Sequence, residues 1–100
     1  NCILAAEIKS IEDLNSKNEF GVLEPSNIIE IPKEEIDVII VPGIAFDKDN
    51  YRIGYGLGYY DQFLKDTKTT TIGLAFKEQL INAIDKEEWD VALDGIISSK

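Results

Sequence analysis

The chain has 100 residues, of which 44% are hydrophobic and 29% are charged, and this balance is typical of one small globular domain. Its net charge of −9 argues against nucleic acid or an anionic membrane as a partner, because no local basic patch offsets it. The longest apolar run, at residues 38–41, is far too short to span a bilayer. Histidine is absent and there is one cysteine, which argues against structural zinc and a disulfide scaffold and favours the cytoplasm.

The amino-terminal part of the chain predicts a short strand, a capped turn and a long loop. The start has neither an initiator methionine nor the pattern of a signal peptide, which suggests a piece of a longer protein. Residues 3–8 suit a strand, and Ser10 followed by Asp13 is typical of a capped helical turn. Residues 15–32 mix Asn, Gly, Ser and Pro with single apolar residues, so we expect a long connection there.

The next element is the clearest strand in the chain. The β-branched run at residues 36–41 predicts a strand that is buried on both faces of a parallel sheet and ends at Pro42 and Gly43. After a loop, Tyr60, Phe63 and Leu64 follow helical spacing, so we expect a helix at about residues 58–66.

The remaining elements continue the alternation. Residues 69–76 predict a second strand, residues 78–84 a short helix, residues 85–90 an acidic turn and residues 91–98 a last strand. Strands that alternate with helices predict an α/β domain with a largely parallel sheet. Such sheets bind ligands at the carboxyl ends of their strands.

The stretch RIGYGLGYYDQFL, at residues 52–64, lies in the connection where such sheets place anion-binding loops. Glycines at alternate positions let backbone N–H groups converge into a nest for phosphate oxygens, and Arg52 offers a bidentate fork for the same oxygens. The spacing is not the G-x-G-x-x-G of a dinucleotide fingerprint, and no Walker A sequence follows. Taken alone, the residues leave two interpretations open: a phosphate nest, or a tight glycine loop with Tyr59 and Tyr60 as core aromatics.

Five blocks in this order resemble the 5-formyltetrahydrofolate cyclo-ligases, also called 5,10-methenyltetrahydrofolate synthetases. The blocks are FGVLEP (20–25), VPGIAFD (41–47), RIGYGLGYYDQFL (52–64), IGLAFKEQL (72–80) and EEWDVALDGII (87–97). The resemblance implies a three-layer, Rossmann-like α/β fold of the NagB/RpiA-like type, with a mostly parallel sheet flanked by helices. It also implies that residues 1–100 form the carboxyl-terminal part of a cyclo-ligase domain whose amino-terminal half is absent.

The resemblance further implies an ATP- and Mg²⁺-dependent ligase that closes 5-formyltetrahydrofolate to 5,10-methenyltetrahydrofolate and releases ADP and phosphate. Arg52 would be the catalytic residue, and Asp61 and Asp90 would hold Mg²⁺. The ATP-binding residues would be Arg52, Ile53, Gly54, Tyr55, Gly56, Leu57, Gly58, Tyr59 and Tyr60. The residues that also face the folate would be Tyr55, Gly56, Leu57, Gly58 and Tyr59.

Each carboxylate and aromatic in these blocks has a structural alternative. Asp61 also suits the helix dipole, although Mg²⁺ binding is favoured for it, and Asp90 suits a turn about as well as Mg²⁺ binding. Tyr60 shares a helical face with Phe63 and Leu64, which favours the core for Tyr60 and ligand contact for Tyr59.

Further structural alternatives concern residues closer to the amino terminus. Phe46 and Asp47 are interpreted as a loop aromatic and a turn aspartate. Glu24 and Pro25 suit a structural turn as readily as a substrate contact.

Three functional hypotheses remain for the chain as a whole. It is the catalytic-half domain of a ligase, a truncated nucleotide- or folate-binding module without turnover, or a structural fragment. Without the strands of the missing half, an edge or an apolar face of the sheet would be exposed. We therefore expect copies of the chain to self-associate.

Overall fold

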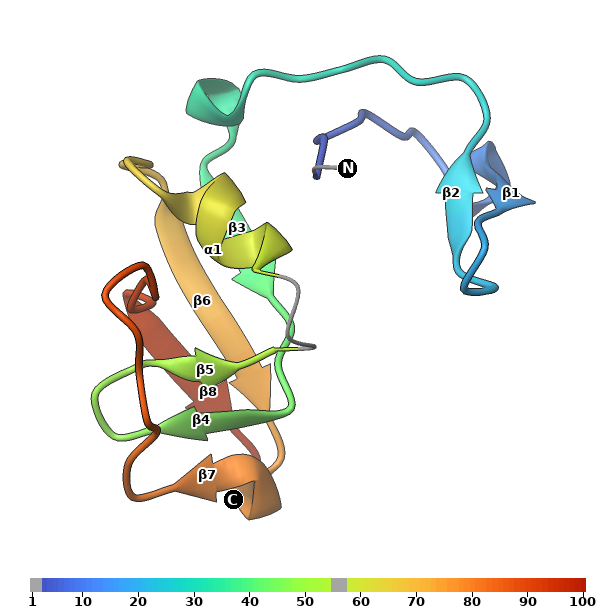
Figure 1. Cartoon of the computed structure of the whole chain (residues 1–100). Helices are drawn as coiled ribbons and strands as arrows, with labels where there is room; N and C mark the ends of the chain where they lie inside the picture. Colours follow the sequence, from blue (N-terminus) through green and yellow to red (C-terminus); the bar gives the residue numbers. More distant parts are fainter. Residues whose placement is uncertain (1–2, 55–57) are drawn as a thin grey trace.

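The computed structural model describes residues 3–54 and 58–100, and its strands form three small sheets (Figure 1). A hairpin is formed by β1 (Leu14–Lys17) and β2 (Leu23–Pro25). The main sheet contains, in spatial order, β3 (Val38–Val41), β6 (Thr70–Ala75) and β8 (Gly95–Ser98). The third sheet contains β5 (Arg52–Ile53), β4 (Ala45–Asp47) and β7 (Leu80–Ile81). The helical elements are η1 (Ile11–Asp13), η2 (Lys33–Glu35), α1 (Tyr59–Leu64) and η3 (Lys77–Gln79).

The main sheet is parallel throughout, with β6 between β3 and β8. Val41 lies beside Gly73, and Leu74 lies beside Ile97. The prediction of an α/β fold with a parallel sheet is therefore confirmed, as are the strands expected at residues 36–41 and 69–76 and the helix expected near residues 58–66.

The core lies on one face of this sheet. Val41 and Phe46 are fully buried, and Leu64 of α1 and Leu93 pack with them. The ring of Phe46 packs directly against β6 at Gly73. A Cβ at position 73 would lie 2.7 Å from Cε1 of Phe46, and glycine avoids this clash because it has no Cβ. The loop aromatic of the sequence interpretation is thus the centre of the core.

The opposite face of the main sheet is open among the described residues. Val38 and Ile40 are 50% and 53% exposed, and Leu74 and Ile97, on the same face, are 53% and 60% exposed. The expectation that residues 36–41 are buried on both faces is wrong, because α1 and β4 cover a single side.

Two predicted elements after β6 differ from the structure. Instead of a helix at residues 78–84, the chain makes the short turn η3 and then β7, which pairs in parallel with β4. The carboxylate of Asp47 accepts a hydrogen bond of 3.1 Å from the N–H of Ile84, which draws this segment toward β4. The last strand starts at Gly95 rather than residue 91, because the N–H of Leu93 donates to the carbonyl of Asn50 instead.

The amino-terminal segment contains a hairpin where the sequence predicts a loop. The carbonyl oxygen of the Asn18 side chain accepts hydrogen bonds from the N–H groups of Phe20 and Val22, and Gly21 takes a φ of +78°, so the segment at residues 18–22 closes a turn. The strand expected at residues 3–8 is reduced to one bridge between Ala6 and Glu30. Figure 1 shows this hairpin lying apart from the α/β core.

The capped turn predicted at Ser10 is present as η1. The carboxylate of Asp13 accepts hydrogen bonds from the N–H groups of Lys9, at 2.9 Å, and Ser10, at 3.4 Å. The glutamate of the Glu24-Pro25 pair lies in β2, where its carboxylate accepts from the side chain of Asn18.

Candidate active site

Arg52 lies on β5, where its side chain folds back toward the carboxyl end of β3. Its Nη1 atom donates a 3.2 Å hydrogen bond to the carbonyl of Pro42, the first residue after β3. Its guanidinium carbon lies 5.1 Å from the centre of the Tyr60 ring, a cation–π contact. Its Nε atom is buried and has no hydrogen-bond partner within residues 3–54 and 58–100. The guanidinium is therefore held at the edge where α/β sheets bind ligands.

Two positions in this stretch favour glycine for different structural reasons. A Cβ on Gly54 would lie 2.5 Å from Nη1 of Arg52, so glycine leaves room for the guanidinium. Gly58 takes a φ of +69° immediately before α1, a left-handed conformation that disfavours other residues. Tyr55, Gly56 and Leu57, which the sequence predicts as ATP and folate contacts, lie outside the described residues.

The two tyrosines that start α1 lie in different surroundings. Tyr59 is exposed, whereas Tyr60 is half-buried and packs against the core around Leu64. The interpretation of Tyr60 as a core residue agrees with this packing, although the same ring also supports Arg52. Ile53 is exposed and pairs with Ala45 across the third sheet.

Asp61 and Asp90 are 29 positions apart in the sequence, yet the fold brings their carboxyl groups close enough for Asp90 to raise the pKa of Asp61. An Oδ atom of Asp61 accepts a 3.2 Å hydrogen bond from the N–H of Val91. Asp90 accepts a 2.8 Å hydrogen bond from the N–H of Glu87, which closes the acidic turn before β8. Both carboxylates thus have a backbone partner that fixes their position.

The surroundings of Asp61 have opposing effects on its pKa. Burial raises the pKa of Asp61 above its ordinary value, and the neighbouring Asp90 adds to the rise. The N–H of Val91 and the positive charge of Arg52 act in the opposite direction without cancelling it. An ionised Asp61 beside Asp90 is therefore under electrostatic stress, which a cation at the pair would relieve.

Asp47, the turn aspartate, is buried and structural. Its Oδ1 accepts from the N–H groups of Asp49 and Tyr51, at 2.9 and 3.0 Å, and its Oδ2 accepts from Ile84. Burial alone would raise the pKa of Asp47, but these backbone donors and the charge of Lys86 outweigh it and hold the pKa below its ordinary value. The interpretation as a turn residue agrees with this geometry.

The sequence reasoning missed two groups at this site, the Pro42 carbonyl and the side chain of Gln79. Gln79 donates from Nε2 to the carbonyls of Gly43 and Ile44, both at 3.1 Å. Pairing between residues 36 positions apart has no local signal, although Gln79 belongs to the block IGLAFKEQL.

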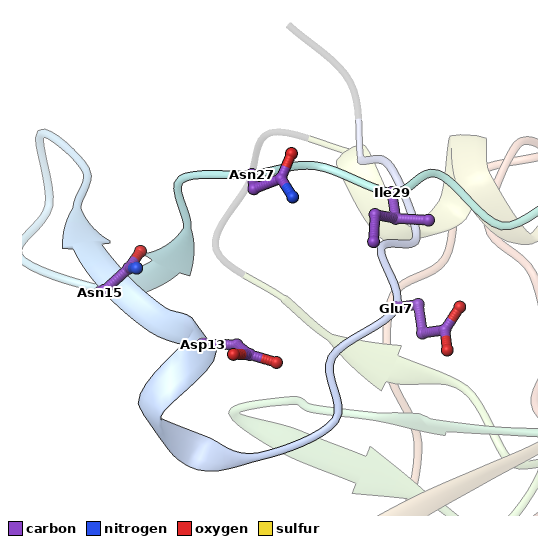
Figure 2. A pocket seen from close by; sticks show the side chains of 5 residues that line it. All are labelled: Glu7, Asp13, Asn15, Asn27 and Ile29. Atoms are coloured by element: carbon purple, nitrogen blue, oxygen red, sulfur yellow. The ribbon is translucent and has the colours of Figure 1, made fainter.

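Two hollows in the described part of the chain lie away from these residues. Figure 2 shows one of them, between the amino-terminal segment and the hairpin, with the polar side chains of Glu7, Asp13, Asn15 and Asn27 and the apolar Ile29 around it. Another lies at the amino ends of β3 and β6, beside Lys33 and Thr70. In the parts of the chain that are described, no three His, Cys, Asp or Glu residues gather as a metal cage, and no helix is long and apolar enough to cross a membrane.

Comparison with known proteins identifies the family. The model of the 5-formyltetrahydrofolate cyclo-ligase family matches residues 2–99. The 5-formyltetrahydrofolate cyclo-ligase of Haemophilus influenzae is 35% identical over 86 residues, which cover 81% of this chain and 46% of that protein. The one from Saccharomyces cerevisiae is 34% identical over 100 residues, which cover 92% of this chain and 47% of that protein.

Solved structures agree with these relatives. A 5,10-methenyltetrahydrofolate synthetase from Mycoplasma pneumoniae superposes with a TM-score of 0.66 at 35% identity, over 75% of this chain and 46% of that one. The enzyme of the same name from Aquifex aeolicus gives 0.69 at 37% identity, over 81% and 42% of the two chains. This chain thus spans about half the length of the relatives that it matches. It belongs to the 5-formyltetrahydrofolate cyclo-ligase family.

Proposed function

We propose that this chain is the carboxyl-terminal part of a ligase that uses ATP to close 5-formyltetrahydrofolate to 5,10-methenyltetrahydrofolate, with release of ADP and phosphate. The observation that supports it most directly is the convergence of Arg52, Asp61 and Asp90 beside the glycine stretch, at the carboxyl end of β3. Family membership supplies the reaction class. Because the chain covers about half of its relatives' length, the activity is proposed for the complete protein.

The proposed reaction needs phosphate positioning more than a nucleophilic side chain. The formyl oxygen takes the terminal phosphoryl group of ATP and ADP leaves, N10 of the folate attacks the activated carbon and loses its proton to water, and phosphate leaves with the formyl oxygen. A chain without histidine suits such a step, because charge neutralisation and alignment supply most of the catalysis in phosphoryl transfer. Arg52, with its charge and remaining N–H groups, is the residue that we assign to the developing negative charge.

The ATP site in this proposal runs from Arg52 through Gly54 to Gly58, Tyr59 and Tyr60. Gly54 has no Cβ, which leaves room for the guanidinium, and Gly58 takes the left-handed φ of +69° immediately before α1. The exposed Tyr59 is the aromatic that we assign to the folate side, together with Tyr55–Leu57 between these glycines.

Mg²⁺ fits the donor set at Asp61 and Asp90. Magnesium sites in nucleotide enzymes use one or two carboxylates and take their other ligands from phosphates and water, so a three-residue protein cage is not needed. Burial raises the pKa of Asp61 and the facing Asp90 adds to the rise, so a cation beside the pair would favour the ionised carboxylates. A bound Mg²⁺ would neutralise phosphate charge, while Val91 N–H and Glu87 N–H keep the two carboxylates in place.

A second candidate function is a nucleotide- or folate-binding module without turnover. It is favoured by the accessibility of Tyr59, which is 37% exposed. Under either function, the single cysteine and the folate substrate of the relatives favour the cytoplasm, which is part of the proposal.

Absorbance of the methenyl product distinguishes the two functions. The chain is incubated with Mg-ATP and 5-formyltetrahydrofolate, alone and with the half of the Haemophilus influenzae relative that it does not match. The ligase function predicts product formation in the mixture, and that this product is lost when the chain carries Arg52→Ala. Binding of Mg-ATP without product in either sample would select the module, and product that survives Arg52→Ala would contradict the assigned role of Arg52.

A further inference from the structure

The side chain of Gln79 makes an unusually complete set of contacts for a residue outside the predicted site. Its Oε1 accepts a 2.7 Å hydrogen bond from the N–H of Phe76, which fixes the amide within η3. Its Nε2 donates to the carbonyls of Gly43 and Ile44, both at 3.1 Å. One half-buried amide therefore joins the end of β6 to the loop that follows β3.

The loop that Gln79 holds is also the loop that holds Arg52. The carbonyl of Pro42, one residue before Gly43, accepts the hydrogen bond from Nη1 of Arg52. The N–H of Ile44 donates a 2.7 Å hydrogen bond to the carbonyl of Ile53, the residue after Arg52. Gln79 thus binds the two residues that directly follow the hydrogen-bond acceptor of Arg52 in the chain.

Arg52 has few other restraints in the part of the chain that is described. Besides the bond to Pro42, its guanidinium has the stacking contact with Tyr60, while its buried Nε is without a hydrogen-bond partner there. An arginine side chain has many rotamers, so a fork that receives phosphate gains affinity when its position is set beforehand. The position of the Pro42 carbonyl is therefore important for the orientation of the Arg52 guanidinium.

We propose that Gln79 is a positioning residue for Arg52: it fixes the Pro42–Ile44 loop and thereby aims the guanidinium at the phosphate site. This inference rests on the proposed function, in which Arg52 binds phosphate. A glutamine is required because the contact needs two donated hydrogen bonds and one accepted bond from a single planar group. Glutamate has the same shape but would place an acceptor against two carbonyls, and methionine has a similar length without donors.

The test uses the fact that Arg52 is the chain's single arginine, so its Nε–Hε group gives one unambiguous NMR cross-peak. Spectra and Mg-ATP calorimetry are recorded for wild type, Gln79→Met and Gln79→Glu. Asn82→Asp is the matched control, because it adds the same charge at an exposed position nearby. Dispersed amide signals establish that each variant is folded, and the near-isosteric glutamate variant serves if the methionine variant is not.

Positioning predicts that both Gln79 variants move the Arg52 cross-peak toward its unfolded position and weaken Mg-ATP binding about tenfold or more, as displaced positioning groups do. In an Arg52→Ala background, Gln79→Met should add no further loss of affinity, and Asn82→Asp should leave both readouts unchanged. An unmoved cross-peak and wild-type affinity in folded Gln79 variants would overturn the inference. If Arg52→Ala alone leaves affinity unchanged, the proposed function fails instead, while the cross-peak still decides whether Gln79 sets the position of Arg52.

Discussion

At the scale of single residues, the fold separates structural carboxylates from those that are free to bind a ligand. The carboxylate of Asp47 accepts hydrogen bonds from three backbone N–H groups, those of Asp49, Tyr51 and Ile84. The carboxylate of Asp61 accepts one backbone hydrogen bond, from the N–H of Val91, and lies near Asp90. The difference follows from position, since Asp47 closes a turn between β4 and β5 whereas Asp61 lies in the first turn of α1.

Asp47 gives a stability prediction with a defined sign. Because the folded state holds the pKa of Asp47 below its ordinary value of 3.8, its contribution is complete above that value and is lost as pH falls through the lower folded-state pKa. Asp47→Asn should therefore lower the free energy of unfolding by about 1–3 kcal/mol at neutral pH, with the difference from wild type shrinking in acid. Urea unfolding from pH 7 downward measures both.

The neighbouring Asp49 provides the control for Asp47. It is exposed, and its ion pair with Lys86 is long, at 3.8 Å, so Asp49→Asn should change stability little. Wild type and Asp47→Asn curves that stay parallel at all pH values would contradict the role of the buried carboxylate.

Residue types alone predicted part of the site. The glycines, Arg52 and Asp61 lie in one stretch, so their chemistry was visible in the sequence, and Asp90 came from the resemblance. The link from Gln79 through the Pro42–Ile44 loop to Arg52 was not predictable, because it depends on β4 and β7 pairing side by side. The roles of Arg52 through Tyr60 in ATP and folate binding stay predictions.

At the scale of elements, the strongest patterns gave the right structure. The β-branched run and the helical spacing of Tyr60, Phe63 and Leu64 predicted β3 and α1. The helix expected at residues 78–84 failed because tertiary contacts override local preference: Asp47 binds Ile84, and Leu80 pairs with Phe46. The hairpin was missed because its turn depends on one asparagine side chain.

Glycine within β6 is a requirement of packing that can be tested. A Cβ on Gly73 would lie 2.7 Å from Cε1 of Phe46 and 3.0 Å from Cδ1 of Leu93, both in the core. Gly73→Ala should therefore lower the free energy of unfolding by about 1–3 kcal/mol through overpacking.

Gly95 in β8 is the matched control, because its Cβ would lie at an ordinary 3.5 Å from Cδ1 of Ile72. Urea unfolding should show that Gly95→Ala is much closer to wild type than Gly73→Ala. Equal effects of the two substitutions would mean that the approach of Phe46 to β6 is not what requires glycine.

At the scale of the whole molecule, the α/β class could be predicted from the alternation of elements, but the open face of the main sheet could not. A continuous apolar run is typical of a strand covered on both sides, whereas here α1 and β4 cover one. The half-exposed Val38, Ile40, Leu74 and Ile97 form an apolar surface that water solvates poorly.

We propose that copies of the chain self-associate through this surface. The net charge of the chain, −9, makes two copies repel each other, so association should strengthen as salt screens this repulsion. Light scattering should show a mass that rises with protein concentration, and Leu74→Lys with Ile97→Lys should keep the chain monomeric. A monomer mass that is independent of concentration and salt would contradict the proposal.

The binding of phosphate by Arg52 is central to the proposed function. Calorimetric titration of the chain with Mg-ATP tests this directly, with Lys17→Ala, which removes the same charge from the distant hairpin, as the control. Arg52→Ala should weaken binding about tenfold or more, the usual effect of losing a charge-assisted hydrogen bond, while Lys17→Ala should leave it unchanged. Equal affinity of Arg52→Ala and wild type would contradict the phosphate site.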